Sequence, residues 1–302
     1  THKIKFMLNK IFKNQEPLVT VGVPSYKRPD LLKDALNSLK DQTYKQIKIL
    51  VGINGDKNDT EKYKTIRDNF KDDLNIEFHF HNKNIGSINN FLYLLNICNS
   101  KYFMWLADDD RISPNLIKSS LSILDKNYDT VTVMPLWELV HSENKKKKII
   151  PSYFDQKSAL KRIINYCDVT DDAFFYGLHR TSNLKKCSFS KFWKPNSDLI
   201  SNWAYVFLFD LVLQGKILFN PDDDAKWIDN DFGIKFYKKE NGNKYKIRLQ
   251  NIIKKINIKY VYIEKIIKWK KYHYLPIMLP LLVFFLLRDL ILEEKVYKKI
   301  KF

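Results

Sequence analysis

Hydrophobic residues in the first 125 positions fall into short apolar runs separated by longer segments of helical spacing. The apolar runs are rich in β-branched and aromatic residues and predict buried strands at 18–23, 47–53, 76–80 and 102–106. The segments between them carry apolar residues every three or four positions and predict helices over roughly 31–39, 61–70 and 88–96. This alternation indicates an α/β fold with a doubly wound, mostly parallel sheet and right-handed crossovers.

The fourth run ends in three consecutive carboxylates, Asp108, Asp109 and Asp110. Open α/β sheets bind ligands beyond the carboxyl ends of their strands. Adjacent carboxylates repel one another, and a divalent cation that carries a phosphate compensates them well because hard cations prefer oxygen ligands. The alternative is a solvated acidic turn before a helix, since Ser113 and Pro114 suit a helix start as capping residue and first helical residue.

The other three predicted strands also run into polar loops. The first is followed by a turn-rich segment that ends at Asp30, which we expect to cap the next helix. Four motifs thus stand at four strand ends: Val23-Pro-Ser-Tyr-Lys-Arg28, Asn54-Gly-Asp56, Asn84-Ile-Gly86 with Asn89 and Asn90, and Ala107-Asp-Asp-Asp110. In this order, residues 18–124 resemble the donor-binding half of a family 2 glycosyltransferase with the glycosyltransferase-A fold.

The resemblance implies a nucleotide-diphosphate sugar as donor and Mn²⁺ or Mg²⁺ as cofactor. It implies donor contacts from Pro24, Ser25, Tyr26, Arg28, Asn54, Asp56, Gly86, Asn89, Asp108 and Asp109, and a metal contact from Asp110. The chemistry agrees, because a tyrosine ring stacks on a base, an arginine neutralises a diphosphate and a glycine admits close backbone approach. Tyr26 as a cover for the strand end and Asn89 as a helix cap are the structural alternatives. Ile53 and Ala107 stand where the family commonly has aspartates.

Residues 126–244 are expected to form the acceptor-binding half, after a nucleotide-sugar-binding half at 18–125. They predict a strand at 130–134, a polar loop at 141–148, a helix at 157–165, an exposed loop at 222–224 and a buried helix that ends at Gly215. The resemblance makes Asp198, in the first turn of that helix, the general base that accepts the acceptor hydroxyl proton. Helix capping is the alternative role. His179 and Arg180 are candidates for acceptor contact or for structural roles, and 227–233 does not match the family's lid motif.

Charge separates the last part of the chain from the rest. The net charge is +18, and residues 246–302 hold 14 Lys or Arg against 4 Asp or Glu, which favours an anionic partner. Isoleucines recur there at helical spacing between lysines, and 275–287 is uncharged but shorter than the roughly 20 residues of a membrane span. We therefore expect 245–302 to be a helical tail that lies in the membrane interface. Packing on the catalytic domain or in an oligomer is the alternative.

The remaining features bear on compartment and on competing functions. Three cysteines without CxxC spacing favour a reducing compartment, and the basic lead-in 1–17 lacks the pattern of a secretory signal. The expectation is an inverting, metal-dependent transferase, peripheral on the cytoplasmic face of the membrane, with a glycan or lipid-linked acceptor. A degenerate module that binds a nucleotide sugar without turnover is the alternative. Nucleic acid is disfavoured because the tail lysines alternate with bulky aliphatic residues.

Overall fold

The structure is a computed structural model that describes residues 18–55, 60–140, 146–169, 173–189, 203–224, 226–229 and 244–299. These residues form two compact units. Unit 1 takes the described parts of 1–153, 173–185 and 217–238, and unit 2 those of 154–172, 186–216 and 239–302. The units cut across the predicted halves, because 126–244 contributes to both of them.

The described part of unit 1 is built on a seven-stranded sheet in the order β10-β6-β9-β4-β1-β2-β3. Its strands are β1 (Val19–Ser25), β2 (Ile47–Ile53), β3 (Ile76–Phe80), β4 (Tyr102–Trp105), β6 (Thr130–Met134), β9 (Leu178–Arg180) and β10 (Lys216–Phe219). Strands β4, β1, β2 and β3 are parallel, and β9 is antiparallel to β4 and β6. The predicted strands are confirmed, with β1 in the interior of the sheet.

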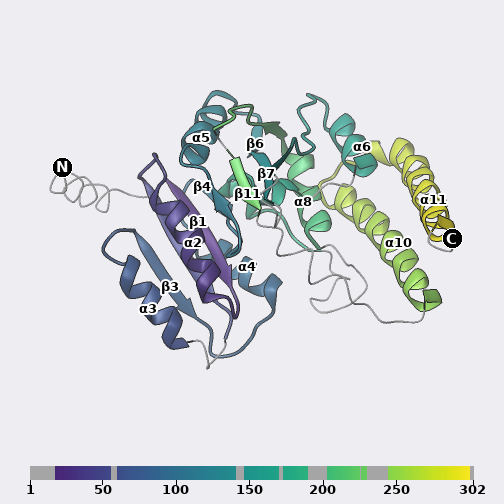
Figure 1. The fold of residues 1–302 in the computed structure, drawn as a ribbon. Helices are drawn as coiled ribbons and strands as arrows, with labels where there is room; N and C mark the ends of the chain where they lie inside the picture. The colour runs from purple at the N-terminus through teal and green to yellow at the C-terminus, as the bar shows by residue number, and fades with distance from the viewer. Residues whose placement is uncertain are drawn as a thin grey trace. The chain divides into compact units, whose positions relative to one another are not determined.

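Helices cover both faces of this sheet (Figure 1). The apolar faces of α2 (Pro29–Lys40), α3 (Thr60–Phe70) and α5 (Leu116–Lys126) share one core with Val19, Val21 and Val23. Helix α4 (Ser87–Ile97) packs on the opposite face, where a Cβ atom at Gly22 would lie 3.2 Å from the Leu94 Cβ. Side chains alternate across a strand, so β1 serves both layers.

Two expected helix starts are wrong by a few residues. Helix α2 begins at Pro29, so Asp30 lies in its first turn and does not cap it. Helix α5 begins at Leu116, after Ser113 and Pro114. Proline is well suited to the first turn of a helix, and at Pro29 its fixed φ sets the start. Ser113 instead bonds to the second sheet, as described below.

The second sheet of unit 1 has the order β5-β11-β7-β8 among the described residues. Its strands are β5 (Arg111–Ile112), β11 (Lys226–Asp229), β7 (Leu136–Val140) and β8 (Lys146–Ile149). The loop expected over 141–148 is wrong for its last part, because Lys146 begins β8, which pairs antiparallel with β7. Lysine-rich edge strands are a common protection against edge-to-edge pairing. The short helices η1 (Ala173–Tyr176) and α7 (Thr181–Leu184) complete unit 1.

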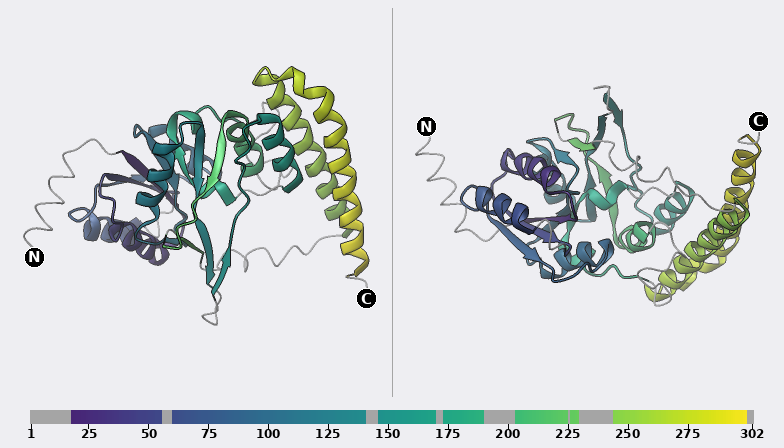
Figure 2. Two further views of the ribbon diagram at one scale, coloured as in Figure 1. Left: turned by 90° about the horizontal axis from the view of Figure 1, so that it is seen from above. Right: turned by 60° about the horizontal axis from the view of Figure 1, so that its bottom comes forward.

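Unit 2 is helical in its described part. It contains α6 (Ala159–Val169), α8 (Trp203–Gln214), α10 (Lys244–Lys268), η2 (Tyr272–Tyr274) and α11 (Leu275–Lys299). Helices α10 and α11 run side by side (Figure 2). The predicted end of α8 is confirmed, since Gln214 is its last residue and the Gly215 N–H bonds to the Leu211 carbonyl oxygen.

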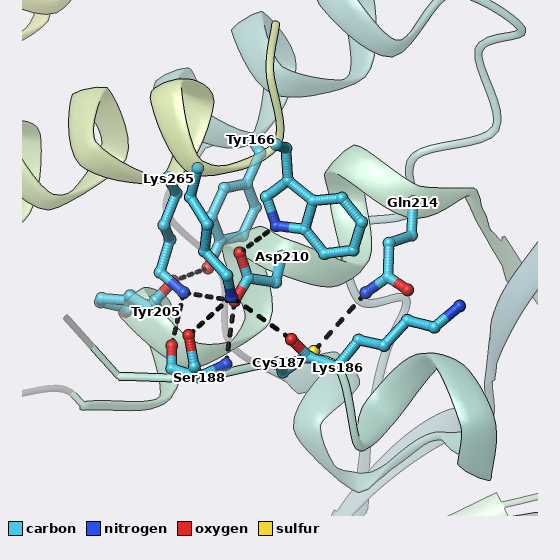
Figure 3. Close-up of polar contacts among 10 residues, drawn as sticks. Tyr166, Lys186, Cys187, Ser188, Tyr205, Asp210, Gln214 and Lys265 are labelled. Carbon is cyan, nitrogen blue, oxygen red and sulfur yellow. Dashed lines mark hydrogen bonds and ion pairs between the residues drawn. The ribbon is translucent and has the colours of Figure 1, made fainter. Parts of the chain in front are cut away.

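A buried polar cluster around Asp210 joins α10 to α8 (Figure 3). The Asp210 carboxylate lies 2.6 Å from the Lys265 ammonium, and it accepts hydrogen bonds from the Trp269 indole (2.7 Å) and the Ser188 N–H (2.9 Å). Lys265 also donates to the Ser188 carbonyl oxygen at 2.6 Å. Burial lowers the pKa of Lys265 although Asp210 opposes the shift. The first tail helix is therefore part of the core of unit 2.

Candidate functional site

The loop after β1 is fixed by Tyr63, a fully buried residue of α3. Its hydroxyl forms a hydrogen bond with the Ser25 hydroxyl (2.9 Å) and accepts one from the Arg28 N–H (3.0 Å). Lys27 between them has a φ of 57°, a left-handed conformation that is uncommon outside glycine. Tyr26 is 38% exposed at this turn, and the Lys27 ammonium lies 5.2 Å from the centre of its ring. Part of this residue is therefore open to a ligand.

Arg28 links this loop to the carboxylates after β4. Its two terminal nitrogens lie 2.6 Å from a carboxylate oxygen of Asp108 and 2.6 Å from one of Asp109. Asp108 is fully buried. Burial raises the pKa of its carboxyl to about 7, although the charge of Arg28 and a hydrogen bond with Ser25 work in the opposite direction. The predicted convergence of the β1 and β4 motifs is thus present in the structure.

Asp110 is held from the second sheet. One of its carboxylate oxygens accepts a hydrogen bond from the Trp227 indole N–H at 3.0 Å. Trp227 lies in β11 and pairs with Ile112 of β5, two residues after Asp110. Trp227 was not predicted as a site residue, because no motif surrounds it. Its one signal is the apolar pair Trp227 and Ile228, which follows the turn at 222–224.

The ends of β2 and β3 are joined by side-chain amides. The buried Asn54 accepts a hydrogen bond from the Ile85 N–H at 2.8 Å, so its amide oxygen holds the loop that contains Gly86. Gly86 has a φ of 85°, in the left-handed region that favours glycine. Asn89 is exposed, and its amide donates to the Ile85 carbonyl oxygen at 2.7 Å. For Asn89 this geometry matches the structural alternative, a local bond at the start of α4.

His179 and Arg180 hold the sheet together in this structure. His179 is fully buried; its Nε2 donates to the Phe175 carbonyl oxygen at 3.0 Å, and its Nδ1 lies 2.8 Å from the Thr132 hydroxyl. Burial lowers its pKa to about 4, so the ring is neutral at pH 7. The Arg180 guanidinium donates to the carbonyl oxygens of Thr130, Leu124 and Asn127, at the end of α5. For His179 and Arg180 these contacts match the structural alternative, and contact of either residue with an acceptor stays a prediction.

The residues present fit a metal ion that arrives with a diphosphate. The described residues contain no group of three His, Cys, Asp or Glu that would enclose an ion alone. Mg²⁺ and similar ions in phosphate-transfer sites commonly take one or two carboxylates and complete their shell with phosphate oxygens and water. Asp109 and Asp110 offer such oxygens at the strand end. Asp56 and Asp198 lie outside the described residues, as does the segment 230–243.

Comparison with known proteins identifies the family. A model of glycosyl transferase family 2 matches residues 20–185, more than half of the chain. The chain belongs to glycosyltransferase family 2. An uncharacterised glycosyltransferase of Haemophilus influenzae is 24% identical over 265 residues, 85% of this chain and 81% of that protein. An uncharacterised glycosyltransferase of Rickettsia typhi is 34% identical over 110 residues, 36% of this chain and 33% of the relative. Among the Rickettsia relatives first matched, the chain therefore spans about a fifth to a third of their length.

Solved structures share the fold. Staphylococcus aureus TarS 1–349 in complex with UDP-GlcNAc has a TM-score of 0.56 and 16% identity, over 82% of this chain and 70% of that one. The mannosyltransferase PcManGT from Pyrobaculum calidifontis, in complex with GDP-Man and Mn²⁺, has a TM-score of 0.51 and 11% identity, over 94% and 81%. The expected fold is confirmed: this family 2 chain has an α/β glycosyltransferase-A fold with a mostly parallel sheet.

Proposed function

We propose that this chain is an inverting, metal-dependent glycosyltransferase that moves a sugar from a nucleotide-diphosphate sugar to a hydroxyl of a glycan or lipid-linked oligosaccharide. The observation that carries the proposal is the meeting of Tyr26, Arg28 and the Asp108–Asp110 carboxylates beyond two neighbouring parallel strands of a family 2 chain. The complexes of the fold relatives with UDP-GlcNAc and with GDP-Man and Mn²⁺ support the donor class. Surface polysaccharide synthesis is the proposed pathway class.

Each side chain has a stated role in this reaction. Tyr26 stacks on the base, Arg28 binds the diphosphate, Asp109 contacts the ribose and Asp110 binds the metal, with Asp108 fixing the position of Arg28. The acceptor oxygen forms a bond to the anomeric carbon while the bond from that carbon to the diphosphate breaks. Asp198 takes the hydroxyl proton. Bound Mn²⁺ or Mg²⁺ supplies positive charge that stabilises the departing diphosphate.

Isothermal titration of UDP, GDP, CDP and dTDP, each with and without Mn²⁺, tests the proposal. We expect one nucleotide to bind tightly and only with the metal, and Asp110→Ala to abolish that binding and the transfer reaction. A folded protein that binds none of them would overturn the proposal. Binding without turnover of the matching sugar nucleotide, across a panel of glycan and lipid-linked acceptors, would favour the degenerate module instead.

We further propose that the membrane is a partner of unit 2 through α11. The apolar run was expected to be too short to cross a membrane, and this is wrong by length: Tyr272–Ile291 forms 20 helical residues that are long and apolar enough to span one. Length and composition alone are weak support. The stronger support is that the two charged residues of 275–291 have partners within the unit: Arg288 pairs with Asp168 of α6, and Asp289 lies 3.6 Å from the ammonium of the buried Lys259.

The outward side of α11 is correspondingly apolar. Met278, Leu282 and Phe285 are buried. The exposed residues of 276–291 are all apolar: Pro276, Ile277, Leu279, Pro280, Val283, Phe284, Leu287 and Ile291. Such a helix has the polarity of a membrane protein, with charge inside and apolar side chains outside. Because one side packs on protein and the preceding tail helix is rich in lysine, we propose that α11 lies in the interface of an anionic leaflet. This supports a peripheral, cytoplasmic-face location.

Flotation with vesicles of phosphatidylethanolamine and phosphatidylglycerol tests this surface. The full chain should float, and the double variant Val283→Glu, Phe284→Glu should not. Tyr128→Glu, at an 89% exposed position of unit 1, is the matched control and should float like the wild type. Alkaline extraction should release the protein from the vesicles, whereas a spanning helix would stay. A dimer in solution that the double variant disrupts, without flotation of the wild type, would assign the surface to a second copy.

A further inference from the structure

Trp227 is an unusual residue to find against an acidic site, because its whole side chain is buried. Its ring lies in an aromatic stack within unit 1, with ring centres 6.1 Å from Trp137 and 4.8 Å from Tyr176. A buried indole N–H needs an acceptor. The acceptor here is the Asp110 carboxylate, 3.0 Å away.

The backbone fixes the indole relative to the carboxylate. Ile228 pairs with Arg111, the residue after Asp110, in an antiparallel ladder. Ser113 adds two side-chain bonds of 2.6 Å, one from the Lys226 N–H to its hydroxyl and one from its hydroxyl to the Asp224 carbonyl oxygen. The segments on both sides of Trp227 and Asp110 are therefore tied together. Rotation of the Asp110 side chain away from the indole would leave a buried donor without its acceptor, which is costly.

We propose that Trp227 is a positioning residue that holds the Asp110 carboxylate in one orientation for the divalent ion. The inference rests on the proposed function, because it assigns Asp110 to the metal. Carboxylates that bind metals are themselves held by hydrogen bonds, and loss of such a partner commonly weakens metal binding 10–100-fold. The second sheet then contributes to donor binding without contacting the donor.

The stack contains its own matched control. Trp137 is the neighbouring indole, and its buried Nε1 has no hydrogen-bond partner among the described residues. Trp227→Phe removes both an indole and a bond to Asp110, whereas Trp137→Phe removes only an indole from the same stack. Trp227→Phe should lose more thermal stability than Trp137→Phe, because it also breaks a buried hydrogen bond. A role limited to packing and stability predicts that the two variants have similar metal affinity.

The experiment is an electron paramagnetic resonance titration of Mn²⁺ in the presence of a saturating nucleoside diphosphate. We expect Trp227→Phe to weaken Mn²⁺ binding about tenfold or more, and Trp137→Phe to change it less than about twofold. In an Asp110→Asn background, Trp227→Phe should have no further effect, because the two act as one unit. If the wild type binds Mn²⁺ and the two Phe variants bind it with equal affinity, the positioning role of Trp227 is overturned and the proposed function is not. A wild type that binds no Mn²⁺ with any nucleotide overturns the proposed function as well.

A metal-free measurement tests the contact itself. In the ¹⁵N spectrum of the apo protein, Asp110→Asn should shift the indole N–H resonance of Trp227 and leave that of Trp137 in place. The two resonances are assigned by their loss in the corresponding Phe variants. If the Trp227 resonance does not respond, the indole is not bonded to Asp110 and the inference fails.

Discussion

Two buried aspartates in this chain have opposite kinds of partners. In unit 2, Asp210 pairs at 2.6 Å with Lys265, whose side chain is 2% exposed, and accepts hydrogen bonds from the Trp269 indole and the Ser188 N–H. The exposed Lys268 ammonium lies farther away, at 3.6 Å. In unit 1, Asp108 pairs with Arg28, whose side chain is 39% exposed and also holds Asp109. A charge whose nearest charged partner is buried stabilises one arrangement. A charge whose partner reaches solvent leaves that partner able to meet a ligand.

The largest expected effect is on the Asp210 cluster. Asp210→Asn leaves the buried Lys265 ammonium without its counter-charge, so the free energy of unfolding should fall by about 3–5 kcal/mol. Asp168→Asn is the matched control, since Asp168 also pairs with a tail helix but is half exposed, and it should cost less than about 1 kcal/mol. Urea denaturation measures both. Equal losses would mean that the Asp210 cluster is no more than another surface pair.

The second effect is on donor binding, and it concerns Arg28, the partner of Asp108. Arg28→Ala should weaken binding of the nucleoside diphosphate by about 1.5–3 kcal/mol, or roughly 10–100-fold, because a charge-assisted hydrogen bond to phosphate is lost. It should lower stability far less than Asp210→Asn, since Arg28 is partly exposed. Arg67→Ala is the control, an exposed arginine of unit 1 that pairs only with Asp68 among the described ion pairs. Calorimetric titration of the nucleoside diphosphate measures the affinity of both variants. An unchanged affinity in Arg28→Ala would show that Arg28 does not bind the donor.

The difference between the units also explains what the sequence could predict. Strand ends and loop motifs are local signals. From them the sequence predicts that Tyr26, Arg28 and the three aspartates lie at one edge of the sheet. Trp227 and Asp110 are 117 positions apart and meet only because β11 joins a second sheet. The hydrophobic periodicity of the sequence does not predict this second sheet. His179 and Arg180 are the opposite case. Their residue types suggested acceptor contact, but they satisfy backbone and hydroxyl groups inside the sheet.

The tail also shows what the sequence can and cannot predict. Its helical spacing was correctly predicted, and so was its apolar run. The sequence did not predict the directions of the lysine and acidic side chains of the tail. Those directions depend on partners for the inward-facing charges, which come from α6, α8 or α10. Lys265 and Arg288 find such partners in Asp210 and Asp168, and the exposed residues of 276–291 are apolar.

The last effect is a pH dependence of stability that the Asp108 carboxyl of unit 1 contributes. The Asp108 carboxyl has a pKa of about 7 in the folded chain against 3.8 for an ordinary aspartate, because burial outweighs the charge of Arg28. Between these values the folded chain binds a proton that the unfolded chain has lost. The stabilisation is therefore complete below about pH 4 and disappears as the pH rises through 7, with a slope of at most about 1.4 kcal/mol per pH unit. The buried His179 contributes the opposite slope below about pH 6.5, because its pKa is lowered to about 4, so the test is the difference between variants. In urea denaturation from pH 5 to 8, the free energy of unfolding of the wild type should fall with this slope relative to that of Asp108→Asn. Asp210→Asn, which keeps Asp108, should have the same pH dependence as the wild type. A wild type that follows Asp108→Asn across the whole range would mean that Arg28 keeps Asp108 ionised, and the contrast between the two buried aspartates would then lie in exposure alone.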